Sequence, residues 1–337
     1  MAVTIKESAR LAGVTHPVVS AVLNGTTASR VSPEKRQKIQ EIVKELNYRP
    51  NFAAKSLVRQ RTRMLGFICG GIDTPYFAEL TEALLTEAES RGYRLMSLMT
   101  DWSHEKELER LNLLMDSSVD GIIMYGDALT PETVEYQKMK EDKFPLVLLE
   151  NYVADFTGIK FDMHPGMERL FELLLETGHR RIVTAHIPDP TGKADAYRHC
   201  CLKYGVELLE YIYPHDPANN WHRIVECAHR IADSKVRPDA LVVFSDFDAL
   251  IMISILCRRG IRIPEDMSVT GIDGANVAAF YNPPLTTILK DRKMMAGMAI
   301  DELLAQINKP AESQPRQLKI STSLIERDSV KDRRGKI

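Results

Sequence analysis

Residues 4–25 read TIKESARLAGVTHPVVSAVLNG and predict two short helices joined by a tight turn. Thr4 and Glu7 have the hydroxyl and carboxylate spacing of a capping box, which predicts that a helix begins at Ile5. The helix is expected to run through Ala12 and to end at Gly13, a residue that readily adopts the left-handed backbone of a helix terminus.

The second helix of this stretch is expected to follow a cap at Thr15. Pro17 is tolerated there because amides in the first helical turn have no intrahelical acceptor to lose. Apolar residues continue through Leu23, and Asn24 with Gly25 stops the helix. Two helices joined by a short turn that contains glycine form a helix-turn-helix.

A third helix is predicted to begin after Ser32, which supplies a hydroxyl cap ahead of Pro33 at the first helical position. Its apolar stripe consists of Ile39, Ile42, Val43 and Leu46. This stripe would close a small core over the first two helices, so residues 1–48 are predicted to form a three-helix head.

The charge of the chain is distributed unevenly. Residues 1–63 carry 12 Lys and Arg against 4 Asp and Glu, whereas the remainder carries 32 against 42. A basic helical bundle can simply be solvated, but a basic helix-turn-helix ahead of an acidic remainder is also typical of a DNA-binding head.

Several segments together resemble the LacI/GalR family of bacterial transcriptional regulators. In the head these are residues 4–25, RVSPEKRQKIQEIVKELNYRPN (30–51) and AAKSL (53–57). Farther along, PYFAEL, ESRGYRL, VDGIIM, ETGHRRI, IRIPEDMSVTGIDG and NPPLTTI follow in the order of that family's periplasmic-binding-protein-like effector domain. The resemblance implies a regulator that binds double-stranded operator DNA as a homodimer and responds to a small, sugar-like effector.

The resemblance places the second helix in the major groove, with its N-terminal end at base edges and phosphates. Ala21 stands where many relatives have an arginine, and a methyl group cannot make the bidentate guanine contact of an arginine. His16 could read a base, contact a phosphate or meet only water. The contacts expected from the head are Thr4, Thr15, His16, Pro17, Ser20, Ala21, Asn24 and Arg30.

Residues 49–63 are expected to form a hinge and linker, with a short helix from Asn51 to Val58. A helix of this length is unstable alone in water. In the family two such helices pair and push leucines into the minor groove, which bends the duplex. Leu57 matches that leucine, and Asn51, Ala54 and Lys55 are expected beside the DNA; an ordinary basic linker is the alternative.

From residue 64 onward, apolar runs of strand length alternate with amphipathic helical segments, which predicts a parallel α/β architecture. The expected strands are 65–69, 94–99, 121–124, 146–149, 182–186, 240–244 and 268–272. The family fold implies two lobes, about 64–161 with 290–318 and 162–288 with 319–330, crossed near Phe161, Ile288 and Leu318. Residues 331–337 form a short charged tail without leucine heptads.

A ligand is expected in the cleft between the lobes, at the carboxyl ends of the strands. Asp246 and Asp273 are predicted to contact it, whereas Asp248 is given the structural role of a helix cap. The positions matched to the family's effector contacts are Asp73, Tyr76, Phe77, Tyr125, Glu150, Phe161, Lys193, Trp221, Asp246 and Asp273. Aromatic residues among them are also common core residues, and the three aspartates could suggest a metal, although no metal site is predicted.

Lys193 stands where the family usually has an arginine, which replaces a planar fork by a point charge. This substitution leaves open an effector that is acidic, phosphorylated or not a simple sugar.

The chain shows no other chemistry-bearing motif. Its five cysteines lack CxxC spacing and are expected to be reduced thiols, and no cofactor is predicted. No leader and no apolar run of about 20 residues is present, so a cytoplasmic protein is expected.

Two other classes of protein share this α/β architecture: enzymes and sugar-binding transport components. An α/β enzyme would need a motif such as GxGxxG, a P-loop or GxSxG, none of which occurs. A sugar-binding transport component would have a similar cleft but an export signal in place of the basic head. The favoured hypothesis is a ligand-responsive repressor; the residues do not reveal whether ligand releases DNA or promotes its binding.

Overall fold

The computed structural model describes residues 5–24, 31–46, 61–117, 119–188, 191–213 and 220–334. The chain divides into two compact units, Met1–Thr62 and Arg63–Ile337, each of which is described by itself. Thr4, Arg30, Asn51, Ala54, Lys55 and Leu57 lie outside the described residues, as does the predicted hinge helix.

The first unit contains the three predicted helices, α1 (Ile5–Ala12), α2 (His16–Asn24) and α3 (Pro33–Glu45). Ser32 caps α3 as predicted, because its hydroxyl oxygen accepts a hydrogen bond from the backbone N–H of Lys35 at 3.4 Å. The buried core of the head is small: Ala9, Ala12, Val19 and Ile39.

Within its described residues, the second unit forms two sheets of six strands each. The first sheet has the order β11-β5-β4-β3-β1-β2 and all its strands are parallel. Its strands are β1 (Met64–Cys69), β2 (Arg94–Met99), β3 (Gly121–Tyr125), β4 (Leu146–Leu149), β5 (Thr157–Asp162) and β11 (Gln317–Ser321).

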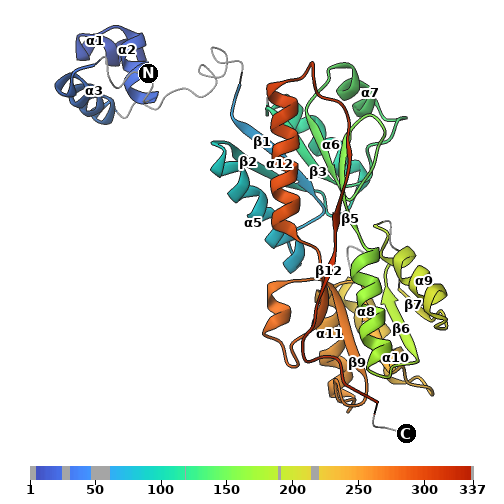
Figure 1. Ribbon diagram of the computed structural model, residues 1–337. Helices are drawn as coiled ribbons and strands as arrows, with labels where there is room; N and C mark the ends of the chain where they lie inside the picture. The colour runs from blue at the N-terminus through green and yellow to red at the C-terminus, as the bar shows by residue number, and fades with distance from the viewer. Residues whose placement is uncertain are drawn as a thin grey trace. The chain divides into compact units, whose positions relative to one another are not determined.

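Alternate residues of the first sheet face two helical layers. Phe67 and Ile123 pack with α5 (Pro75–Ser90) and α12 (Arg292–Asn308), which lie side by side (Figure 1). Ile68 and Ile122 pack on the other face with α6 (His104–Asp116) and α7 (Val134–Glu141). This sheet and the helices on its two faces form the first lobe.

The second sheet has the order β12-β10-β9-β8-β6-β7, and only its edge strand β12 runs antiparallel to its neighbour. Its strands are β6 (Ile182–His186), β7 (Glu210–Ile212), β8 (Ala240–Val243), β9 (Ser268–Asp273), β10 (Thr286–Leu289) and β12 (Ser323–Ile325). Helices α8 (His164–Glu176) and α9 (Lys193–Tyr204) cover one face, and α10 (Asn220–Ala232) and α11 (Asp246–Arg258) the other. With the 3₁₀ helix η1 (Asn276–Ala279), these elements form the second lobe.

The chain passes between the two sheets after β5, after β10 and between β11 and β12. The third passage is at Thr322, because every residue of β11 pairs with β5. Residues 319–321 therefore belong to the first lobe, whereas the predicted boundary fell after residue 318. Parallel strands that end at these passages bring the carboxyl edges of the two sheets toward each other.

No helix within the described ranges combines the length and the apolar character that a membrane span requires.

Candidate functional site

A cavity of about 380 Å³ lies where the carboxyl ends of strands from both lobes meet. Six of the predicted effector residues line it: Asp73, Tyr76, Phe77, Tyr125, Lys193 and Asp273. The sequence did not predict the other lining residues, which include Trp102, His104, Glu107, Asp127, Tyr213, Phe244, Asp248 and Lys290. The first lobe supplies four of the aromatic side chains in the described wall, Tyr76, Phe77, Trp102 and Tyr125, and both lobes supply polar side chains.

The aromatic wall is built around Phe77 on α5. Its ring meets Trp102 edge-on at a centroid distance of 4.9 Å and Tyr125 at 4.8 Å. Trp102 has a φ of +59°, a left-handed backbone that is uncommon for a bulky residue. Its indole lies against Gly70 so closely that a Cβ there would fall on the ring, so Gly70 makes room for this wall.

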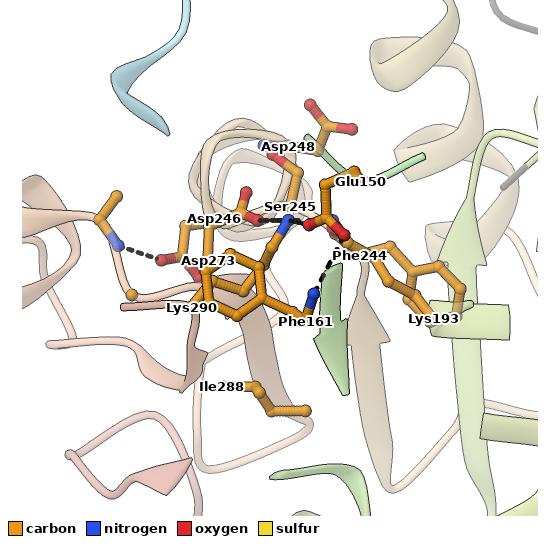
Figure 2. A network of polar contacts seen from close by, with 12 residues as sticks. Glu150, Phe161, Lys193, Phe244, Ser245, Asp246, Asp248, Asp273, Ile288 and Lys290 are labelled. Atoms are coloured by element: carbon orange, nitrogen blue, oxygen red, sulfur yellow. Dashed lines mark hydrogen bonds and ion pairs between the residues drawn. The ribbon is translucent and has the colours of Figure 1, made fainter. Parts of the chain in front are cut away.

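Carboxylates and a carbonyl oxygen contact two lysines of the wall, the buried Lys290 and the partly buried Lys193 (Figure 2). The Nζ atom of Lys290 lies 2.6 Å from Oε1 of Glu150 and 4.0 Å from Oδ1 of Asp273. The Nζ atom of Lys193 donates to the carbonyl oxygen of Phe244 at 2.6 Å and to Oδ1 of Asp273 at 3.4 Å. Burial opposes the charge of Lys290, but Glu150 and the other groups around it outweigh that effect and raise the pKa of this lysine.

The backbone is strained where two of these carboxylates leave their strands. Glu150 follows β4 with a φ of +55°, and Asp273 ends β9 with a φ of +124°. Left-handed backbone in residues other than glycine costs about 1–3 kcal/mol and is concentrated at functional sites. The packing around both residues therefore stabilises an arrangement that the isolated chain would avoid.

The structure places Asp246 and Asp248 opposite to the prediction: Asp248 lines the cavity, and Asp246 does not. The side chain of Asp246 is fully buried and does not line the cavity: it accepts hydrogen bonds from the backbone N–H of Ala275 at 2.7 Å and from the hydroxyl of Thr287. Burial, with a smaller effect of Asp273, raises its pKa to about 7.

Asp248 lines the cavity, where its Oδ2 atom accepts a hydrogen bond from the hydroxyl of Tyr213 at 2.6 Å. Burial raises its pKa to about 6. The cap of α11 is instead Ser245, whose hydroxyl oxygen accepts from the backbone N–H of Asp248. Residues i and i+2 of a helix are about 200° apart around its axis, so Asp246 and Asp248 point to opposite sides of α11.

Three further predicted contacts do not line the cavity. Glu150 and Phe161 lie behind the cavity wall. The ammonium group of Lys290 contacts the carboxylate of Glu150 and lies 5.1 Å from the ring centroid of Phe161. Trp221 is about half exposed and packs against Phe247 at a centroid distance of 4.9 Å. It lies at the start of α10 and is not among the described residues that line the cavity.

The head presents the start of α2 to solvent. Thr15, His16 and Pro17 are exposed, whereas Val19 is fully buried in the core of the head. Ser20 and Ala21 are partly exposed one turn later, and Asn24 ends the helix. The residues predicted to contact DNA from this helix therefore include its three exposed N-terminal positions.

Metal and thiol chemistry have no visible site in the described ranges. No group of three or more His, Cys, Asp or Glu side chains there could hold a metal ion. All five cysteines are described and are free thiols, with only Cys257 exposed, and burial raises the pKa of the Cys69 thiol to about 12.

Two family models match the chain: "Bacterial regulatory proteins, lacI family" over residues 4–51 and "Periplasmic binding protein-like domain" over residues 171–330. A helix-turn-helix head followed by such a two-lobed domain defines a DNA-binding regulator that responds to a ligand. The HTH-type transcriptional repressor PurR of Vibrio cholerae is 31% identical over 342 residues and covers 98% of each chain. PurR of Pasteurella multocida is 29% identical, covering 98% of this chain and 99% of its own. The chain belongs to the LacI/GalR family of bacterial transcriptional regulators.

Solved structures share the same fold. The Lac repressor bound to ONPG in its repressed state superposes with a TM-score of 0.83 at 22% identity, over 98% of this chain and 100% of that one. The complex of the transcriptional regulator CelR with cellobiose gives a TM-score of 0.68 at 25% identity, over 97% and 99% of the two chains. The predicted α/β architecture and the family are confirmed, and the relatives are transcriptional regulators rather than enzymes.

Proposed function

We propose that this protein is a homodimeric transcriptional repressor of the bacterial cytoplasm, whose affinity for a near-palindromic operator changes when a small effector enters the interlobe cavity. One observation carries the proposal: a single chain combines a helix-turn-helix whose second helix exposes its N-terminal end with a cavity walled by both lobes. Two heads related by a two-fold axis read the two halves of a symmetric site.

Polar contacts also join the two lobes. Glu79 on α5 of the first lobe accepts from the backbone N–H of Asn276 in the second lobe at 3.1 Å. Its other oxygen lies 2.6 Å from Arg292, which donates to the carbonyl oxygen of Gly274 at 2.9 Å. A ligand that binds both walls favours one interlobe angle, and by linkage the ligand and DNA affinities change reciprocally.

The composition of the cavity supports a sugar-like effector and argues against the acidic or phosphorylated one that Lys193 left open. Both lysines of the wall already contact oxygen atoms of the protein, so neither ammonium group is free to bind a phosphate. Hydroxyl groups suit carboxylate acceptors, and aromatic faces suit the apolar face of a sugar ring. Relatives of the same fold have been solved with cellobiose and, for a regulator of Alkaliphilus metalliredigens, with D-xylulofuranose.

Leu57→Ala tests the hinge part of the proposal. Because a leucine wedge at this position would stabilise a bent operator, its loss should weaken operator binding by roughly 10- to 100-fold, or about 1.4–2.8 kcal/mol. Fluorescence anisotropy with a duplex selected by the wild-type chain measures the affinity, and circular-permutation mobility measures the bend. Unchanged affinity and unchanged bending would remove Leu57 from the DNA contacts.

A further inference from the structure

The wall of the effector cavity carries more negative than positive charge. Its carboxylates are Asp73, Glu107, Asp127, Asp248 and Asp273, and its ammonium groups are Lys193 and Lys290. Lys290 is within ion-pair distance of Glu150 behind the wall as well as Asp273, and Lys193 reaches Asp273. The excess charge of the wall is therefore negative before any ligand enters.

Of the two wall carboxylates that the second lobe contributes, Asp273 meets both lysines, whereas Asp248 lies at ion-pair distance from neither. Its described partner is the neutral hydroxyl of Tyr213, and no Lys or Arg nitrogen in the described ranges forms a salt bridge with it. A carboxylate removed from bulk water is costly to ionise unless a cation or several donors compensate it. A ligand cation at this position would supply that compensation.

A second, independent observation points to a ligand here. Tyr76 lines the cavity and is only 5% exposed, yet its hydroxyl group has no hydrogen-bond partner in the structure. A buried hydroxyl without a partner costs about 1–3 kcal/mol, which a ligand oxygen or nitrogen would relieve. The neighbouring Phe77, Trp102 and Tyr125 also line the cavity, and the π face of an aromatic ring attracts a cation.

We propose that the effector is a small hydroxylated amine, such as an amino sugar, whose protonated nitrogen pairs with the carboxylate of Asp248 and whose polar ring atoms meet the hydroxyl of Tyr76. The inference rests on the proposed effector site and narrows its ligand class. An N-acetylated ligand would lose the charge, and a phosphorylated one would meet repulsion from the same wall.

Matched ligands separate charge from shape. Thermal unfolding and isothermal titration of the full chain are measured with glucose, glucosamine, N-acetylglucosamine and glucose 6-phosphate, and with the corresponding galactose and mannose series. In at least one series the amine should bind at least tenfold more tightly than its neutral parent, and the N-acetyl and phosphate members should bind more weakly than the amine. The proposal is overturned if no amine binds, or if a neutral or anionic member of the same series binds as tightly as the amine.

Asp248→Asn removes the charge while keeping an oxygen that can accept from Tyr213. We expect this variant to lose at least tenfold in affinity for the amine and less than threefold for the neutral parent. The control is Asp195→Asn, which changes an exposed carboxylate on α9 outside the cavity wall and should leave both affinities unchanged. Equal losses for amine and parent would contradict the pairing. If a neutral or anionic sugar binds and the amine is not preferred, the proposed effector site is supported and only the proposed ligand class is refuted. If no member of any series binds, both the effector site and the ligand class are contradicted.

Discussion

Lys290→Met should lower the free energy of unfolding of the effector unit by about 3–5 kcal/mol. Lys290 is 1% exposed, and its ammonium group lies 2.6 Å from the carboxylate of Glu150. Removing the lysine leaves that carboxylate buried without its counter-charge, which is far more costly than losing an ion pair at the surface. Urea unfolding followed by circular dichroism measures the change.

The double variant Glu150→Gln with Lys290→Met is the control for this prediction. Since it removes both charges together, it should recover most of the stability that the single variant loses. A single variant that unfolds within about 1 kcal/mol of the wild type would show that the pair is not the buried contact described above.

Val19→Asp should abolish specific operator binding, with a loss of roughly 100-fold or more, while effector binding stays within twofold of the wild type. Val19 is fully buried in a small core, whose other buried members in the described part of the head are Ala9, Ala12 and Ile39. An unpaired carboxylate in so small a core costs at least about 3 kcal/mol, enough to account for a 100-fold loss of affinity. Because the head is a separate compact unit, the effector lobes should keep their fold.

Leu11→Asp is the matched control for Val19→Asp. It adds the same charge to the head at a side chain that is 45% exposed, so it reports the electrostatic effect of a new carboxylate without disrupting the core. Electrophoretic mobility shift at two salt concentrations measures both variants. Equal losses would mean that the charge, rather than the folding of the head, determines the result.

The sequence predicts most of this fold because the strands that matter are short runs of β-branched and apolar residues. Residues 94–99, 146–149 and 182–186 were predicted with the bounds that β2, β4 and β6 have in the structure. β5 was missed because Gly158 and Lys160 interrupt its apolar pattern, and β7 and β12 because three residues are too few to show a period. β10 and β11 were not among the predicted strands either. Pairing with neighbouring strands, rather than local propensity, stabilises these segments.

The cavity was predicted less completely, since contacts between distant residues determine it. Lys290 was missed because a lysine is normally exposed, and its partner Glu150 is far away in the sequence. Lys290 nevertheless follows β10 directly, and ligand sites form at the carboxyl ends of parallel strands. The same reasoning led to the prediction of Asp273 at the end of β9 and could have identified Lys290. The exchange of Asp246 and Asp248 could have been anticipated from helical phase once Ser245 was recognised as the cap of α11.

Selection of binding sites from a random duplex library by the purified full-length chain tests the central claim most directly. The selection is run at two salt concentrations, with and without the amino sugars described above, and with Val19→Asp as the negative control. The account predicts a two-fold symmetric motif with a flexible central step, recovered by the wild type and not by the variant. Recovery of no motif under any of these conditions, with binding that depends only on salt, would contradict a sequence-specific repressor and would leave the basic head as a binder of backbone charge.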